Sequence, residues 1–186
     1  MAEPKRESAG CVGFVTVRRS AEHGYFGGYL IVNFHGRPLE FHCTLPVKPS
    51  RAQEILFGRT LDDFICGEQI TKALVSKAKL NTNLIFTDCM AAISSRLVSD
   101  HPIAMLQPRA DSSQAEPGLA IPISAADNLA HFRLGDYDLS VSSRFAGDEA
   151  IFKQRWHELK LDVDLHEPFE RIAEALLEAH PAARAA

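Results

Sequence analysis

The sequence predicts a single domain of the α/β class with an α+β tendency, and three observations predict it. Three runs of strand-forming residues follow one another closely at positions 11–18, 29–34 and 39–45. A helical stretch then leads into a short apolar run at 84–88, and two amphipathic helical patterns end the chain. We therefore expect an N-terminal antiparallel three-stranded meander, a helical crossover to a buried strand, a mixed sheet and two C-terminal helices.

Length and composition agree with one domain. The chain has 186 residues, of which 46% are hydrophobic, and this is enough for one well-buried core. We expect the domain to span residues 11–180, with a disordered N-terminus at 1–10, a mobile loop at 108–118 and a frayed tail at 181–186. The loop is expected because its two prolines, two serines and glycine interrupt any apolar period.

Charge and cysteine usage narrow the classes of partner and compartment. The net charge of −4 gives no general attraction for the phosphates of nucleic acids or for anionic membranes. The four cysteines form no C-x-x-C pair, so we expect reduced thiols in the cytoplasm. The polar N-terminus and the short apolar run that follows it match neither a signal peptide nor a membrane span.

A β-hairpin is predicted at residues 27–45. Gly36 can adopt positive φ and Pro38 cannot donate to a ladder, which fits a loop at 35–38. Alternation along the second arm gives an apolar row of Leu39, Phe41, Cys43 and Leu45 and a polar row of Glu40, His42 and Thr44. We expect the apolar row to lie in the core. The first arm, 29–34, is apolar on both faces and is therefore expected to be an interior strand.

Helical segments follow the hairpin. Ser50 and Gln53 form a capping box that opens a short helix at 51–57. A second short helix is expected at 61–66 and, after a glycine, a longer one at 68–80, whose apolar residues form one stripe. This stretch is the expected crossover, which places the strand at 84–88 parallel to an earlier strand.

The second half of the chain carries weaker patterns. The expected elements are one or two helical turns at 90–96 and strands at 103–106, 119–124, 129–134 and 139–144. Asp148 is expected to cap the first C-terminal helix, with Ile151, Phe152, Trp156 and Leu159 on its apolar face. Pro168 stands near the start of the second helix, which has a clear apolar stripe.

The best candidate site lies at the end of the strand at 84–88. Ligands in open α/β sheets bind beyond the carboxyl ends of parallel strands, and Asp88 and Cys89 occupy such an end. Asp88 could hold a metal, orient a histidine or cap the next turn, and we favour capping. Cys89 is a candidate nucleophile with His42 or His101 as its base, although no Gly-x-Cys-x-Gly elbow surrounds it.

The polar row of the hairpin offers a second candidate. His42 lies beside Glu40, and a catalytic or metal-binding histidine is weighed there against a solvated or packing one, which we favour. Cys43 points to the opposite face, so it would need Cys66 or Cys89 to make a site. A small buried hydrophobe is the preferred interpretation of Cys43.

A glycine-rich stretch at 20–27 joins the first two strands. It opens no helix, so it lacks the N-terminus that a phosphate cradle needs. We expect Tyr25 and Phe26 to be exposed on it and, with Glu40, to form a contact surface for a partner or ligand.

Two functions remain in view. The first is a non-catalytic binding or assembly module without a cofactor, whose partner is a protein or a second copy, and neither nucleic acid nor membrane is expected to bind it. The alternative is a metal- or thiol-dependent hydrolase, with Asp88 at its centre and a divalent metal as cofactor. The β-β-β-α-β order suits a nuclease of RNase H-like layout by fold analogy. However, the strand at 11–18 carries no acid for the first metal ligand.

Overall fold

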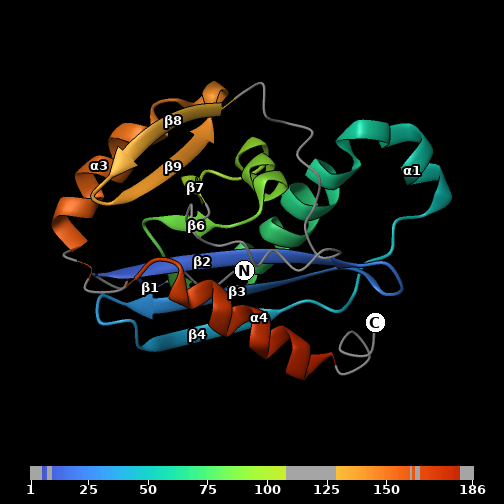
Figure 1. The fold of residues 1–186 in the computed structure, drawn as a ribbon, viewed down its shortest axis with the longest axis horizontal. Helices are drawn as coiled ribbons and strands as arrows, with labels where there is room; N and C mark the ends of the chain where they lie inside the picture. The colour runs from blue at the N-terminus through green and yellow to red at the C-terminus, as the bar shows by residue number, and fades with distance from the viewer. Residues whose placement is uncertain (1–5, 8–9, 108–128, 160, 162–163, 181–186) are drawn as a thin grey trace.

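A seven-stranded mixed sheet forms the centre of the molecule, with helices on both faces (Figure 1). The structure is a computed structural model that describes residues 6–7, 10–107, 129–159, 161 and 164–180. The strands are β2 (Cys11–Ser20), β3 (Gly24–Asn33), β4 (Pro38–Cys43), β6 (Ile85–Thr87), β7 (Ile103–Leu106), β8 (Leu129–Leu134) and β9 (Tyr137–Ser142). Their order in space is β4-β3-β2-β6-β7-β9-β8, and a separate parallel pair joins β1 (Arg6–Glu7) to β5 (Leu80–Asn81). The predicted α/β class is confirmed.

The meander and the crossover are confirmed as well. β2, β3 and β4 pair antiparallel in sequence, which makes β3 an interior strand. Gly36 has φ 74° in the hairpin loop, where the side chain of Asn33 accepts hydrogen bonds from the backbone of His35 and Arg37. After the helical link the chain returns to β6, which lies parallel to β2, and then to β7, which lies parallel to β6. The strand order therefore reverses between β2 and β6.

The helical link departs from the prediction at one point. Ser50 and Gln53 form the expected capping box on α1 (Arg51–Phe57), which is followed by η1 (Gly58–Thr60). The break expected at Gly67 is wrong, because a π-helix, η2 (Asp63–Thr71), runs through it into α2 (Lys72–Lys77). A Cβ atom on Gly67 would lie 1.9 Å from Ser94 Oγ of the helix η3 (Met90–Leu97). The glycine thus permits two helices to cross closely and does not end either of them.

Two cores lie on the two faces of the sheet. One contains Phe14, Phe86, Phe152 and Phe169 and is covered by α3 (Asp148–Leu159), which follows the short helix η5 (Ser143–Phe145), and by α4 (Glu167–Ala179). The other lies under η2, α2 and η3, and it includes Val15, Tyr29, Ile31, Ile65 and Leu74. Both C-terminal helices are therefore present, as predicted. None of the described helices is long and apolar enough to cross a membrane.

The start of α3 differs from the prediction. Asp148 is buried, and its carboxylate accepts hydrogen bonds from Arg96 Nε at 2.9 Å and Nη2 at 3.4 Å. An ion pair with η3 thus takes the place of the expected cap. Ile151, expected on the apolar face, is 38% exposed. The strand predicted at 119–124, the loop at 108–118, the tail at 181–186 and most of the N-terminal segment lie outside the described residues.

The predicted core face of the hairpin's second arm is also wrong. Leu39 and Phe41 are 44% and 39% exposed, Leu45 is 79% exposed, and Cys43 is exposed rather than buried. The reason is the position of β4 at the edge of the sheet. Helix α4 packs on β3 and β2, where a Cβ atom on Gly28 would lie 2.5 Å from Ile172 Cγ2, and it leaves the outer strand at the margin.

Candidate functional site

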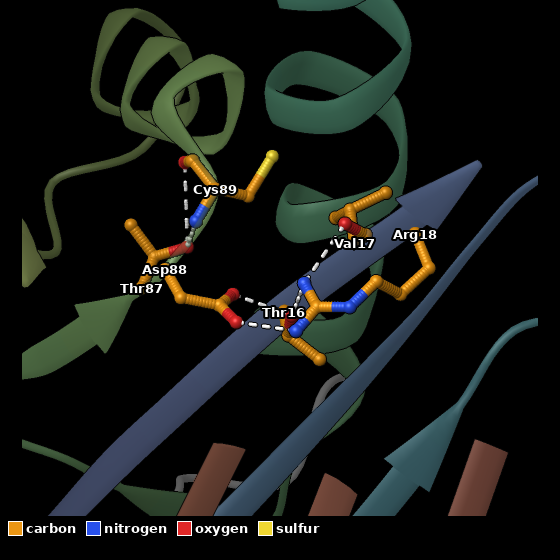
Figure 2. A network of polar contacts seen from close by, with 6 residues as sticks. All are labelled: Thr16, Val17, Arg18, Thr87, Asp88 and Cys89. Carbon is orange, nitrogen blue, oxygen red and sulfur yellow. Dashed lines mark hydrogen bonds and ion pairs between the residues drawn. The ribbon is translucent and has the colours of Figure 1, made fainter. Parts of the chain in front are cut away.

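Asp88 follows β6 directly, at the carboxyl end of this strand and beside β2. Its carboxylate points at two side chains of β2 (Figure 2): Oδ1 accepts from Thr16 Oγ1 at 2.5 Å and Oδ2 accepts from Arg18 Nη2 at 2.5 Å. Arg18 also donates to the Thr16 hydroxyl and, at 3.4 Å, to the Val17 carbonyl. The expected cap on the next turn is absent, because no side chain caps η3. Asp88 is instead one member of a polar triad with Thr16 and Arg18.

The triad is partly buried. The side chains of Arg18 and Asp88 are 25% and 24% exposed. Burial alone would lower the pKa of Arg18, but the charge and the hydrogen bond of Asp88 outweigh it and raise that pKa. The guanidinium therefore stays protonated and neutralises the carboxylate locally.

Cys89 occupies the next position but faces the other side of the sheet. Its N–H donates to Thr87 Oγ1 at 3.1 Å, and its side chain is directed toward the neighbouring helix η2 (Figure 2). Cys89 is 5% exposed and Cys66 of η2 is fully buried. A hydrogen bond with Cys89, together with burial, raises the pKa of the Cys66 thiol. Buried thiols of this kind are poor nucleophiles, because the thiolate is the reactive form.

Glu40 and His42 share a face and touch, as the alternation along β4 predicts. His42 Nε2 lies 2.6 Å from Glu40 Oε1. The same carboxylate accepts hydrogen bonds from the backbone N–H of Lys79 at 2.9 Å and of Leu80 at 3.0 Å. Burial alone would raise the pKa of Glu40, but the Lys79 N–H, His42 and the Leu80 N–H together lower it. Glu40 thus connects β4 to the start of β5, which is a structural role.

The candidate catalytic residues do not form one site. Glu40 and His42 pair with Ile31 and Tyr29, on the face that carries the second core. The side chain of Thr16, which binds Asp88, lies on the opposite face of the sheet. It stands between Val15 and Val17, which both point into the second core, and successive side chains of a strand point to opposite faces. Two strands, β3 and β2, also separate β4 from β6.

His101 stands still further from Asp88. It lies before β7, at the amino end of this strand. Because β6 and β7 are parallel, the amino end of β7 lies at the opposite end of the strands from Asp88, which follows the carboxyl end of β6.

The aromatic pair Tyr25 and Phe26 is not exposed. The ladder between β2 and β3 continues to the pair Ser20 and Gly24, so both aromatics lie within β3 and are 1% and 2% exposed. Tyr25 donates its hydroxyl to Asp62 Oδ1 at 2.5 Å. The expectation that they are exposed is therefore wrong, because the connection is only a turn at residues 21–23 and both aromatics belong to β3.

Arg18 and Thr16 are the site residues that sequence analysis missed. The available signal was a cation at the end of an apolar strand, but the partner of that cation depends on the register between β2 and β6. Among the described residues, no group of three or more His, Cys, Asp or Glu side chains is arranged to hold a metal ion. Comparisons of the chain with models of known families, with curated proteins and with solved structures give no match.

Proposed function

We propose that the protein is a non-catalytic binding or assembly module that acts through its surfaces on a protein partner. One observation carries the proposal. The carboxylate at the point where the strand order reverses, Asp88, is held by Arg18 and Thr16 at 2.5 Å each. Ligands of open α/β sheets are bound at this point, and here its acid is already paired within the chain.

The pairing weighs against metal-assisted hydrolysis for two physical reasons. A divalent ion would have to displace the Arg18 guanidinium, which makes a charge-assisted hydrogen bond to Asp88 Oδ2, or the Thr16 hydroxyl, which donates to Oδ1. It would also need further oxygen or nitrogen ligands, and the described part of the chain offers no group of three suitable side chains. Burial weighs against Cys89 as a nucleophile in the same way, because it is 5% exposed.

The exposed apolar side chains support a binding role. β4 exposes Leu39 and Phe41 to solvent, and the residue two positions beyond its end, Leu45, is exposed as well. None of the residues of α1 is buried, and its Ile55 and Leu56 are 66% and 82% exposed. Apolar side chains gathered on a surface typically mark contacts with other proteins. The four free cysteines support a reducing compartment, and we include a cytoplasmic location in the proposal.

The alternative, a nuclease-like hydrolase, is favoured by the strand order. A three-stranded meander leads through helices to a strand parallel to its first member, with Asp88 at the exit. This matches the RNase H-like layout considered from the sequence, but only at the level of fold. That layout needs an acid on its first strand, which is β2 here. The side chains of β2 that contact Asp88 are instead Thr16 and Arg18.

Thermal unfolding with added Mn²⁺, Mg²⁺ or Zn²⁺ tests the proposal, with Asp88→Asn as the matched control. An ion at about 100 times its Kd stabilises a protein by about 2.7 kcal/mol. For a chain of this size, that amounts to a rise in Tm of roughly 5–10 °C. We expect no rise in the native chain beyond that of Asp88→Asn. A rise in the native chain that the variant lacks would place an ion on Asp88 and overturn the proposal.

A further inference from the structure

The helices on one face of the sheet leave its edge strand, β4, partly uncovered (Figure 1). A Cβ atom on Gly28 of β3 would lie 2.5 Å from Ile172 Cγ2 of α4 and 3.4 Å from Phe41 Cε2 of β4. Cys43 pairs with Gly28, and paired residues share a face, so Cys43 lies on this face beside Phe41. Phe41 is nevertheless 39% exposed, and Cys43 is exposed as well. These two side chains form the floor of what we call the α4–β4 ledge.

Helix α4 forms the wall of the ledge, from Arg171 to His180, and is tied down at both ends of β4. Just before the strand, Arg171 Nη1 donates to the Gly36 carbonyl at 3.0 Å. Just after it, His180 Nε2 lies 2.8 Å from the Thr44 carbonyl oxygen. Leu45 follows this carbonyl and is 79% exposed, so apolar surface continues beyond the floor. The ledge is therefore an apolar strip with a fixed helix along one side.

The wall of the ledge is acidic. Glu174 and Glu178 are exposed, and they follow Arg171 at i+3 and i+7. This spacing places both acids on the same side of α4 as Arg171, which reaches the hairpin loop. Arg171 itself pairs with Glu167 at 2.8 Å. Arg37 is exposed in the hairpin loop, beyond the end of the floor, so the side of the floor next to α4 carries negative charge.

The shape and the charge of the ledge favour one kind of occupant. An added strand does not fit, because β4 is short, begins at Pro38 and is shifted in register against β3. A second copy that placed its own α4 on the ledge would bring two acidic helix sides together, and acid also repels nucleic acids and anionic membranes. A helix with lysine or arginine beside its apolar side does fit. It would lie next to α4 on the sheet, as helices do in an α/β layer, with its cations toward Glu174 and Glu178.

We propose that the α4–β4 ledge binds a basic amphipathic helix of a partner protein, which packs beside α4 and extends the helix layer over β4. The inference rests on the proposed function and states the chemistry of the partner. The apolar side of the bound helix covers Phe41 and Cys43, and its lysine or arginine side chains lie against Glu174 and Glu178.

Cys43 is a native reporter of binding, because it is exposed on the floor while Cys11, Cys66 and Cys89 are buried. The probe is a synthetic helical peptide of leucine and lysine, about 14 residues long to give about four turns. The matched control peptide has glutamate in place of each lysine. At about ten times its Kd the lysine peptide leaves about one site in eleven free, so alkylation of Cys43 by iodoacetamide should slow about tenfold. The glutamate peptide should leave the rate unchanged.

Variants place the lysine peptide on the ledge, with its Kd measured by fluorescence anisotropy. Phe41→Ser removes the aromatic floor, and Glu174→Lys combined with Glu178→Lys reverses the charge of the wall. Each change should weaken binding by about tenfold or more. Thermal unfolding verifies that each variant is folded.

Two controls match these changes elsewhere on the surface. Ile55→Ser removes an apolar side chain of α1 that is 66% exposed. Glu22→Lys combined with Asp136→Lys changes the net charge by the same amount, at two exposed turn residues. Both should bind the lysine peptide within about twofold of the native chain, since neither touches the ledge.

Several results would overturn the inference. These are alkylation of Cys43 that the lysine peptide does not slow, equal protection by the glutamate peptide, or equal loss of binding in the control variants. Slower alkylation of Cys43 at rising protein concentration without peptide, with a dimer in sedimentation equilibrium, would put a second copy on the ledge and also overturn it. The binding-module proposal stands in each of these cases. Ion binding that requires Asp88 would overturn the module proposal and leave the ledge intact.

Discussion

The ion pair between Arg18 and Asp88 should stabilise the fold more than an exposed pair does. Both side chains are about three-quarters buried, at 25% and 24% exposure. Hydrogen bonds to charged groups contribute about 1.5–3 kcal/mol, whereas exposed ion pairs contribute about 0.2–1 kcal/mol. Because the pair is neither fully buried nor fully exposed, we expect a coupling free energy of about 1.5–2 kcal/mol, at the low end of the first range.

A double-mutant cycle measures this coupling. The variants are Arg18→Ala, Asp88→Asn and the two combined, and their free energies of unfolding come from urea titrations. The matched control is the pair Arg51 and Glu54 of α1, which lies at 2.9 Å with side chains 83% and 41% exposed. We expect its coupling to be about 0.5 kcal/mol or less. Equal coupling in the two pairs would refute the view that Asp88 is firmly held by Arg18.

Three further predictions concern packing and pH. Gly67→Ala should destabilise the protein by about 1–3 kcal/mol because its Cβ would lie 1.9 Å from a side-chain oxygen and 2.6 Å from a backbone nitrogen of η3. Gly147→Ala, with nothing within 4 Å, should change the unfolding free energy by less than about 0.5 kcal/mol, and equal urea midpoints for the two variants would contradict the crossing. Hydrogen bonds lower the pKa of Glu40, so its contribution to stability is present above about pH 4.3 and is lost as the pH falls through its lower folded value. The stability difference between the native chain and Glu40→Gln should therefore narrow from neutral pH to about pH 3, and a constant difference would count against the hydrogen bonds. Burial and the bond to Asp62 raise the pKa of Tyr25, so its contribution is present below about pH 10 and is lost as the pH rises toward the folded value. An ultraviolet titration in which Tyr25 ionises like free tyrosine would contradict this.

Local patterns in the sequence were sufficient to locate the seven strands of the main sheet, the hairpin and the crossover, although not the full length of β3. Gly36 and the alternation along residues 39–45 defined the hairpin, and the position of Asp88 at a strand end followed from the parallel crossover. Alternation states which side chains share a face, but it does not state which neighbouring element covers that face. The apolar row of β4 was for this reason assigned to the core, although the edge position exposes it.

The glycines of β3 show a second limit of prediction from sequence. Gly27 and Gly28 suggested a loop, but a Cβ atom on either would lie 2.5 Å from a helix side chain, Ile70 on one face and Ile172 on the other. They allow helices to pack closely on a strand, which local sequence does not distinguish from a turn. The partners of Asp88 were missed for a similar reason. The pairing of Val15 with Thr87 determines which residues of β2 Asp88 contacts, and local sequence does not give this pairing.

The most direct test of the central claim, that Asp88 is bound within the chain and is not available for catalysis, is a titration with Mn²⁺ followed by amide NMR. This ion broadens the signals of nuclei close to its binding site. We predict no selective broadening at residues 86–90 in the native chain. Broadening centred on Asp88, and lost in Asp88→Asn, would contradict the account.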